Sequence, residues 1–306
     1  MRALGFSRAP ATDAKRWPLR RLVLALPRAW HLSSLDAPTV AGTWCIAFLQ
    51  ASGTPHEAVR WAALFLMLAT WLCYVGDRVL DARDTHTGGR TRHRLYGALW
   101  NTRRLGLVTV VSAATLGCAA TAWFGLSGSL LRGYLLLTAV SLGYFAWVHG
   151  GAERHARVLA KEAAVGVIFA IGCALPAWDA AASAGRAQLV PTAGLFAVAC
   201  WLNCVAIERW EGRGNVPAHA HWSTQWAARH LAMLLCLAAL AAVALVLLGY
   251  DHHRSVPLAS CLAVAFVLLA VLEWVHARLS AGALRILADV ALLTPLAWWL
   301  VPRLLR

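Results

Sequence analysis

The chain has 306 residues, of which 60% are hydrophobic and only 14% are charged, and it contains 16 tryptophans. A soluble protein of this length needs a far more polar surface, whereas a bilayer accepts apolar side chains on the outside of a protein. These proportions exclude an ordinary soluble domain and predict a membrane protein. The formal net charge of +14 is then explained by basic loops at the membrane surface, which anionic lipid headgroups attract.

Residues 1–33 are basic and contain one short apolar stretch, LVLALP. The stretch is too brief, and its flanks are wrong, for a signal peptide. We expect a basic cytoplasmic N-terminus with an interfacial helix that lies on the membrane. Residues 34–306 are expected to form a single transmembrane domain, with acidic loops near 77–104 and 208–229.

Apolar stretches of about 20 residues are long enough for a helix to cross roughly 30 Å of hydrocarbon. Short links with turn residues join them, so each helix should return beside the one before it. The sequence therefore predicts an all-α polytopic membrane protein with nine transmembrane helices. The expected spans are Ser34–Ala51, Ala58–Gly76, Leu105–Gly125, Leu130–His149, Glu162–Trp178, Leu189–Ile207, His230–Gly249, Val256–Val275 and Leu284–Val301.

The basic residues indicate the orientation, because cytoplasmic loops keep Lys and Arg. With the N-terminus inside, 22 of the 28 Lys and Arg residues lie on the cytoplasmic side and 6 on the outer side. This predicts a multi-pass protein of a cell membrane, as in a bacterial inner membrane, with a cytoplasmic N-terminus. The basic residues are spread over separate loops, so no nucleic-acid partner is expected.

Five of the 14 carboxylates gather in two places, each at the cytoplasmic end of a span. Asp77, Asp81 and Asp84 follow the second span in YVGDRVLDARD, while Glu208 and Glu211 follow the sixth in WLNCVAIERWEG. Residues three or four apart share one face of a helix, so each cluster can point one way. Crowded negative charge at a helix C-terminus also opposes the helix dipole and needs compensation.

Two kinds of compensation are open. The interleaved arginines could form simple ion pairs with these carboxylates at a solvated helix end. Alternatively, a divalent cation could bind, because Mg²⁺ prefers oxygen ligands and commonly uses one or two carboxylates plus the oxygens of a bound phosphate. A natural ligand for such a site in a membrane is a lipid diphosphate, with its head at the carboxylates and its tail inside the bundle.

This arrangement resembles the UbiA superfamily of intramembrane prenyltransferases. Its members have nine transmembrane helices, an acidic motif after helix 2, typically N-D-x-x-D-x-x-x-D, and another after helix 6, typically D-x-x-x-D. The two clusters here have the same placement, and KEAAVGVIFAIGCALP, residues 161–176, resembles the family's fifth helix. The resemblance covers nearly the whole chain and implies a UbiA-like bundle with a cytoplasm-facing cavity.

Both motifs depart from the pattern of the family. Alignment of Asp77 and Asp81 with the last two aspartates of the first motif puts Cys73 and Tyr74 where the family usually has Asn and Asp. Asp84 offers a third carboxylate from a different position. The second motif reads E-x-x-E, which is one residue tighter than usual.

The resemblance implies that Mg²⁺ and basic residues stabilise a departing diphosphate while an acceptor attacks the allylic carbon. The implied catalytic residues and direct or water-mediated metal ligands are Asp77, Asp81, Glu208 and Glu211, with Asp84 as a further metal ligand. The implied substrate contacts are Arg78, Asp84, Lys161, Asn203 and Arg209. Prenyl diphosphate, a membrane-soluble acceptor and membrane lipids are the expected partners, and the oligomeric state stays open.

Several of these residues also have plain structural interpretations. Asn203 could form an interhelical hydrogen bond, and Lys161 or each arginine could simply mark the cytoplasmic side. Asp289 lies four residues after Arg285 in the last span, which favours a local ion pair. Glu273 and His276 are three residues apart, which again suggests pairing or snorkelling.

Three functions agree with the sequence. The first is a magnesium-dependent prenyltransferase, and the second is a UbiA-like membrane protein that binds an isoprenoid lipid without turning it over. The third is a transporter, which is disfavoured because the carboxylates cluster at one membrane face rather than at the midplane. A CDP-alcohol phosphotransferase ranks lower, because its D-G-x-x-A-R core is absent from the sequence.

Overall fold

The structure of the chain is a computed structural model, and it describes residues 26–54, 56–81, 98–150, 160–212, 216, 220–248 and 256–304. Within these residues the chain is helical and contains no strand. The main helices are α2 (Asp36–Ser52), α3 (His56–Asp81), α5 (Arg104–Gly125), α6 (Gly128–Gly150), α7 (Lys161–Ala180), α8 (Ser183–Glu211), α9 (Trp222–Arg229), α10 (Leu231–Leu248), α11 (Val256–Val275), α12 (Ala281–Ala291) and α13 (Thr294–Leu304). A short 3₁₀ turn, His276–Arg278, follows α11.

Seven of the described helices are long and apolar enough to cross a membrane: α3, α5, α6, α7, α8, α10 and α11. The prediction of an all-helical chain with several membrane-crossing helices is therefore confirmed. The first expected span forms α2, which has only 17 residues. The ninth is not one continuous helix but two pieces of 11 residues each.

The break between α12 and α13 has a local cause. Pro295 has no N–H to continue the helical bonding, and Leu296 donates to Leu293 (3.0 Å) instead of to Leu292. The carbonyl of Leu292, freed in this way, accepts the indole N–H of Trp44 on α2 at 2.7 Å. A backbone carbonyl that lies away from water needs such a partner, so the break is stabilised by the first helix.

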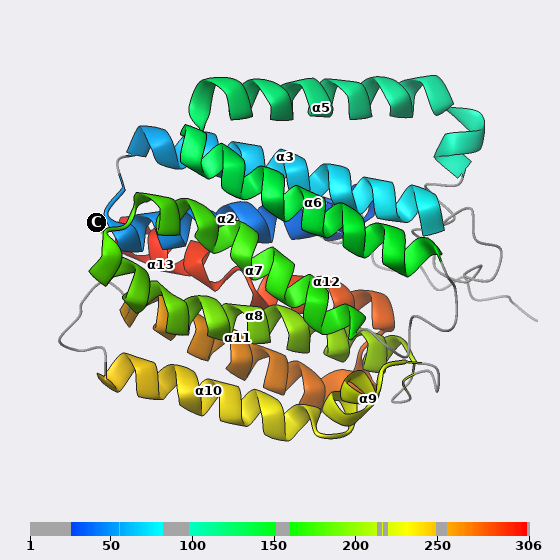
Figure 1. The fold of residues 1–306 in the computed structure, drawn as a ribbon. Coiled ribbons are helices and arrows are strands. Elements are labelled where there is room, and N and C mark those ends of the chain that lie inside the picture. Colours follow the sequence, from blue (N-terminus) through cyan, green and yellow to red (C-terminus); the bar gives the residue numbers. More distant parts are fainter. Residues whose placement is uncertain are drawn as a thin grey trace, which may run out of the picture.

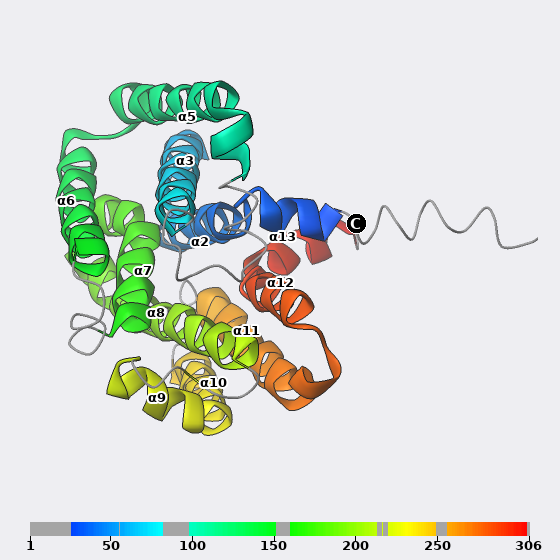
Figure 2. The ribbon, with the colours of Figure 1, turned by 90° about the vertical axis from the view of Figure 1, so that its right-hand side faces the viewer.

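The helices form a closed arrangement in which neighbours in sequence are mostly neighbours in space (Figure 1). Viewed from the side in Figure 2, α2 lies between α3 and α7 on one side and α12 and α13 on the other. The last two helices thus pack back on the first. The contact between α7 and α8 is the most extensive, since Gly166 allows the backbone of Trp201 to approach closely.

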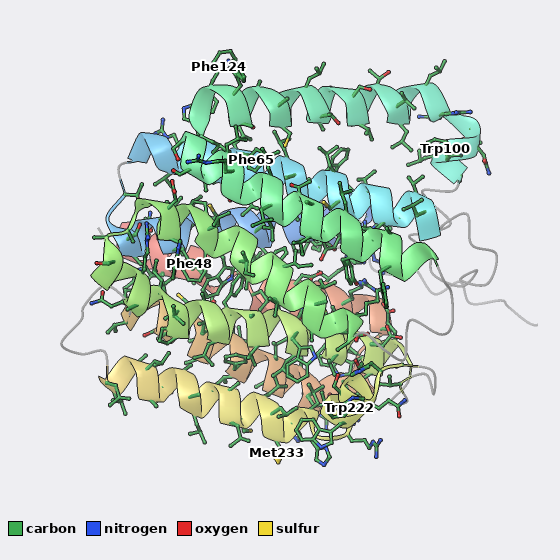
Figure 3. All side chains as sticks on the ribbon, viewed as in Figure 1. Phe48, Phe65, Trp100, Phe124, Trp222 and Met233 are labelled. Atoms are coloured by element: carbon green, nitrogen blue, oxygen red, sulfur yellow. The ribbon has the colours of Figure 1, made fainter. Side chains whose placement is uncertain are left out.

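The centre of the bundle is built from aromatic and small residues. Trp44 stacks on Phe196 with ring centroids 4.3 Å apart, and Phe48 packs beside both. All three side chains have no exposed surface. Figure 3 shows Phe48 among the central helices. This core joins α2 to α8 and fixes the position of the first helix.

Near a second proline, as near the first, a side-chain donor bonds a backbone carbonyl that has no partner within its own helix. Pro176 lies inside α7 and cannot donate to the carbonyl of Gly172. The buried hydroxyl of Tyr134 on α6 donates to that carbonyl at 3.0 Å. The bond connects α6 to α7 and keeps α7 continuous through the proline.

The outer helices expose apolar side chains rather than burying them. Leu105 and Phe124 on α5 are 84% and 77% exposed, and Figure 3 shows Phe124 on the outer side of α5. In α5 only Thr121 is buried. An apolar surface of this size agrees with a helix that faces lipid rather than water.

Candidate functional site

Helices α3 and α8 end on the same side of the bundle, and each continues beyond its expected span into the residues of an acidic motif. Helix α3 continues through Asp77 and Arg78 to Asp81, and α8 continues through Glu208 to Glu211. Lys161 is exposed at the first position of α7, which runs antiparallel to α8 and begins at this same end. These helix ends lie toward the right-hand side of Figure 1, where the start of α7 and the end of α8 are near α9.

Tyr144 on α6 connects the first acidic motif with α7 and α8. Its hydroxyl interacts electrostatically with Asp77, Glu162 and Cys204, which belong to α3, α7 and α8. The hydroxyl oxygen is buried and has no hydrogen-bond partner within the part of the chain that the structure describes. Glu162 in turn accepts the hydroxyl of Thr224 on α9 at 2.5 Å.

Arg78 reaches from α3 to the residues at the start of α2. Its guanidinium lies 3.7 Å from the Asp36 carboxylate and donates to the Ser34 hydroxyl and, at 3.3 Å, to the carbonyl of His31. Both Arg78 and Asp36 are 3% exposed. A buried ion pair is the role that the geometry gives Arg78, and the predicted diphosphate contact stays a prediction.

The same arginine explains an unusual backbone conformation. Ser34 has a φ of 63°, which is uncommon for a residue with a Cβ. Its hydroxyl accepts a bond from Arg78, and its N–H donates to the carbonyl of His31. The turn before α2 is thus held in place by a side chain from α3.

Residues of the second acidic motif form ion pairs with helices in the C-terminal half of the chain. Arg209 lies 3.1 Å from Glu273 on α11 and donates to the carbonyl of Ala228 at 2.8 Å. Glu211 forms an ion pair with Arg285 on α12. Arg285 therefore reaches α8, although the sequence favoured a pair with Asp289 four residues away.

Glu273 is the centre of a small polar network. It accepts the indole N–H of Trp210 at 2.6 Å and lies 4.0 Å from His276. The predicted proximity of Glu273 and His276 is confirmed. The network joins α8 to α11 and positions the helix end that carries the second motif.

The remaining predicted residues have diverse surroundings. Asn203 is buried on α8, and its amide nitrogen lies 3.3 Å from the Asp289 carboxylate. This interhelical hydrogen bond was one of the two interpretations that the sequence left open. Glu208 is partly exposed one turn before Glu211. Asp81 is the last residue of α3, and Asp84 lies outside the described residues.

Sequence reasoning did not single out His31 and Asp36, which together with Asp289 form a second polar cluster at the start of the first helix. The imidazole of His31 lies 2.7 Å from Asp36. A carboxylate inside an apolar stretch is costly in a membrane and often functional. That signal was present at Asp36, but the partners come from α3 and α12, which only the fold brings together.

Among the described residues, the three side chains whose ligand atoms lie close enough to share a metal ion are His31, Asp36 and Asp289, and not the carboxylates of the two acidic motifs. The acidic motifs nevertheless carry the kind of ligand that a hard cation binds. Asp77, Glu208 and Glu211 supply carboxylate oxygens, which are the ligands that Mg²⁺ prefers. Glu211 shares its charge with Arg285, so it would serve such an ion only in part. Lys161 adds a positive charge at the same end of the bundle, as a phosphate group requires.

The chain matches no known family model, no curated protein and no solved structure.

Proposed function

We propose that this protein is a UbiA-like membrane prenyltransferase, which transfers a prenyl group from a prenyl diphosphate to an aromatic or lipid acceptor. The observation that supports the proposal is that α3 and α8 end, and α7 begins, at the same end of an apolar bundle, and that these helix ends carry Asp77, Glu208 and Lys161. A diphosphate head with an isoprenoid tail has the matching polarity, since one end is strongly anionic and the other is entirely apolar.

In this proposal the chain crosses the membrane nine times. To the seven long apolar helices it adds α2 and the α12–α13 pair. Seventeen residues of α2 span about 26 Å at 1.5 Å per residue, which approaches the hydrocarbon thickness. The two short helices at the C-terminus, joined at the Leu292 break, act together as one crossing. The charged helix ends then face the cytoplasm, in agreement with the distribution of basic residues.

The carboxylates of Asp77 and Glu208 would hold Mg²⁺ together with Glu211, and the resemblance implies Asp81 as a further ligand. When bound, the ion would neutralise the diphosphate and make it a better leaving group. Lys161 at the start of α7 would attract the same phosphates. The Tyr144 hydroxyl, which is buried and interacts electrostatically with Asp77 and Glu162, would donate to a phosphate oxygen or to the acceptor.

A second candidate is an isoprenoid-lipid-binding protein without turnover. Three predicted site residues, Arg78, Arg209 and Glu211, already form ion pairs with other helices. Cys73 and Tyr74 occupy positions where the resembling family has Asn and Asp. Each of these features reduces the charge available to a magnesium diphosphate, while an apolar lipid tail could still bind.

The experiment uses membranes that contain the full chain, incubated with radiolabelled prenyl diphosphates, extracted lipids, aromatic acceptors and Mg²⁺. Wild type is compared with Asp77→Asn and Glu208→Gln. A matched control is Asp179→Asn, because Asp179 lies at the other end of α7, where it accepts hydrogen bonds from the hydroxyls of Ser127 and Ser129.

We expect a magnesium-dependent product from wild type and the control, and a loss of at least about tenfold in both site variants. No product from any protein, together with saturable binding of the labelled lipid that the site variants weaken, would favour the binding protein. No product and unchanged lipid binding in both variants would rule out this site.

A further inference from the structure

A second polar cluster lies apart from the carboxylates of the proposed magnesium site, where the first and the last helices meet. It consists of His31, Asp36 at the start of α2, and Asp289 on α12. One ligand atom from each residue lies within 4.8 Å of the other two. His31 and Asp36 are buried, at 7% and 3% exposure, and Asp289 is partly buried.

The cluster concentrates negative charge in a region with little water. Tyr74 interacts electrostatically with both Asp36 and Asp289, which places the two carboxylates of the cluster near one ring. Arg78 supplies a positive charge 3.7 Å from Asp36. A divalent cation between Asp36 and Asp289 would balance their two negative charges, which are costly to bury in such surroundings.

An orphaned amide oxygen points to a ligand at the same place. Asn203 on α8 is 6% exposed, and its amide nitrogen lies 3.3 Å from the Asp289 carboxylate. The amide oxygen is buried and accepts no hydrogen bond from the described part of the chain. A buried oxygen without a donor costs free energy unless something binds it. The amide oxygen of Asn203 is therefore a fourth possible ligand, beside one imidazole nitrogen and two carboxylates.

We propose that His31, Asp36 and Asp289, with the amide oxygen of Asn203, bind a divalent transition-metal ion of the Zn²⁺ or Mn²⁺ class. One imidazole nitrogen among oxygen ligands favours such an ion over Mg²⁺, whose sites use oxygen alone. Ligands about 2.1 Å from a metal lie roughly 3.0 to 4.2 Å apart. The separations in the cluster run from 2.7 Å to no more than 4.8 Å, so small side-chain movements suffice.

Arg78 then acts as a positioning residue. It lies 3.7 Å from the same Asp36 carboxylate oxygen that His31 contacts, while the backbone N–H of Ala37 donates to the other carboxylate oxygen at 3.0 Å. Such outer contacts orient metal ligands. The ion would join α2, α12 and α8, and so close the bundle between its first and last helices. This site does not depend on prenyl transfer.

The test uses the full chain, purified in detergent, stripped with a chelator and titrated with Co²⁺, whose visible absorption reports on coordination. We expect one equivalent to bind, with displacement by Zn²⁺. His31→Gln and Asp289→Asn should each weaken binding by at least about tenfold. His276→Gln is the matched control, and the double variant Asp77→Asn/Glu208→Gln should bind Co²⁺ as wild type does.

A second measurement needs no variant. X-ray absorption of the wild type with one equivalent of Zn²⁺ should show one imidazole and otherwise oxygen neighbours. Sulfur neighbours would assign the metal to the free cysteines, and the proposal would be wrong. It would also be wrong if the wild type bound no stoichiometric metal, since the charge would then be balanced by a protonated His31. Loss of binding in the double variant, with retention in His31→Gln, would move the metal to the prenyltransferase site.

Discussion

Trp44, in the first long helix, donates its indole N–H to the carbonyl of Leu292 at 2.7 Å, across a sequence separation of 248 residues. The carbonyl is available because the helical bonding is interrupted before Pro295. Both groups are buried. The hydrogen bond therefore connects the C-terminal helices to the first long helix.

Replacement of Trp44 by Phe removes this donor and leaves most of the aromatic packing in place. We expect Trp44→Phe to lower stability by about 1–2 kcal/mol, the range of interhelical hydrogen bonds in membranes. Thermal unfolding in detergent measures the effect. Trp274→Phe is the matched control, because Trp274 is 81% exposed, and its melting temperature should stay within error of wild type. Equal losses in the two variants would contradict the role of the bond.

The buried pair of Asp36 and Arg78 should behave as a unit. Asp36→Asn or Arg78→Met each leaves one charge buried without its partner, and we expect each to cost about 3–5 kcal/mol. The double variant should lose clearly less than the sum of the two. Unfolding of all four proteins gives the coupling free energy directly.

A control for this cycle is the Glu211–Arg285 pair, whose side chains keep 20% and 19% of their surface. Because solvent screens it, the corresponding coupling should be about 1 kcal/mol or less. A larger coupling there than between Asp36 and Arg78 would mean that burial does not determine the strength of these pairs.

Gly166 should tolerate no side chain. A Cβ at this position would lie 2.8 Å from the backbone nitrogen of Trp201 and 2.9 Å from the carbonyl oxygen of Ala197. Helices α7 and α8 would have to separate, so Gly166→Ala should cost about 1–3 kcal/mol. Gly143→Ala on α6, where nothing lies within 4 Å, should instead leave stability unchanged or raise it by up to about 1 kcal/mol. Chemical denaturation of both variants checks the contrast.

The variant Tyr144→Phe distinguishes a structural role of the Tyr144 hydroxyl from a functional one. The hydroxyl is buried and receives no partner from the described residues, so its removal should leave the melting temperature unchanged or higher. If the proposed transferase is correct, kcat/KM should fall about tenfold or more, because the hydroxyl is a buried donor that interacts electrostatically with Asp77 of the proposed site. A lower melting temperature with normal activity would show that the hydroxyl is purely structural.

The helices themselves were largely predictable. The expected spans Leu105–Gly125 and Val256–Val275 agree with α5 and α11 to within one residue at each end, because long apolar runs bounded by turn residues leave few alternatives. The acidic motifs extend α3 and α8 beyond the expected ends, since charged residues do not by themselves terminate a helix. The break after α12 was missed, although Pro295 was visible in the sequence.

The site was predictable only in part. The sequence placed Asp77 and Glu208 at the same membrane face, and the structure brings their helix ends to one end of the bundle. It could not assign Arg78 to Asp36 or Arg285 to Glu211, because nearby residues in sequence offered equally good partners. Ion pairs in a bundle depend on which helices are neighbours, and helical periodicity does not specify this.

The sequence by itself determined the membrane environment, the approximate helices and the two acidic motifs, because length and polarity decide which segments cross a membrane. The tertiary structure alone decided that His31, Asp36, Asn203 and Asp289 meet, and that Trp44 stabilises the break near Leu292. These contacts join segments up to 248 residues apart. Their geometry follows from the packing of apolar faces that are nearly uniform in sequence, so only the folded bundle specifies which polar groups become partners.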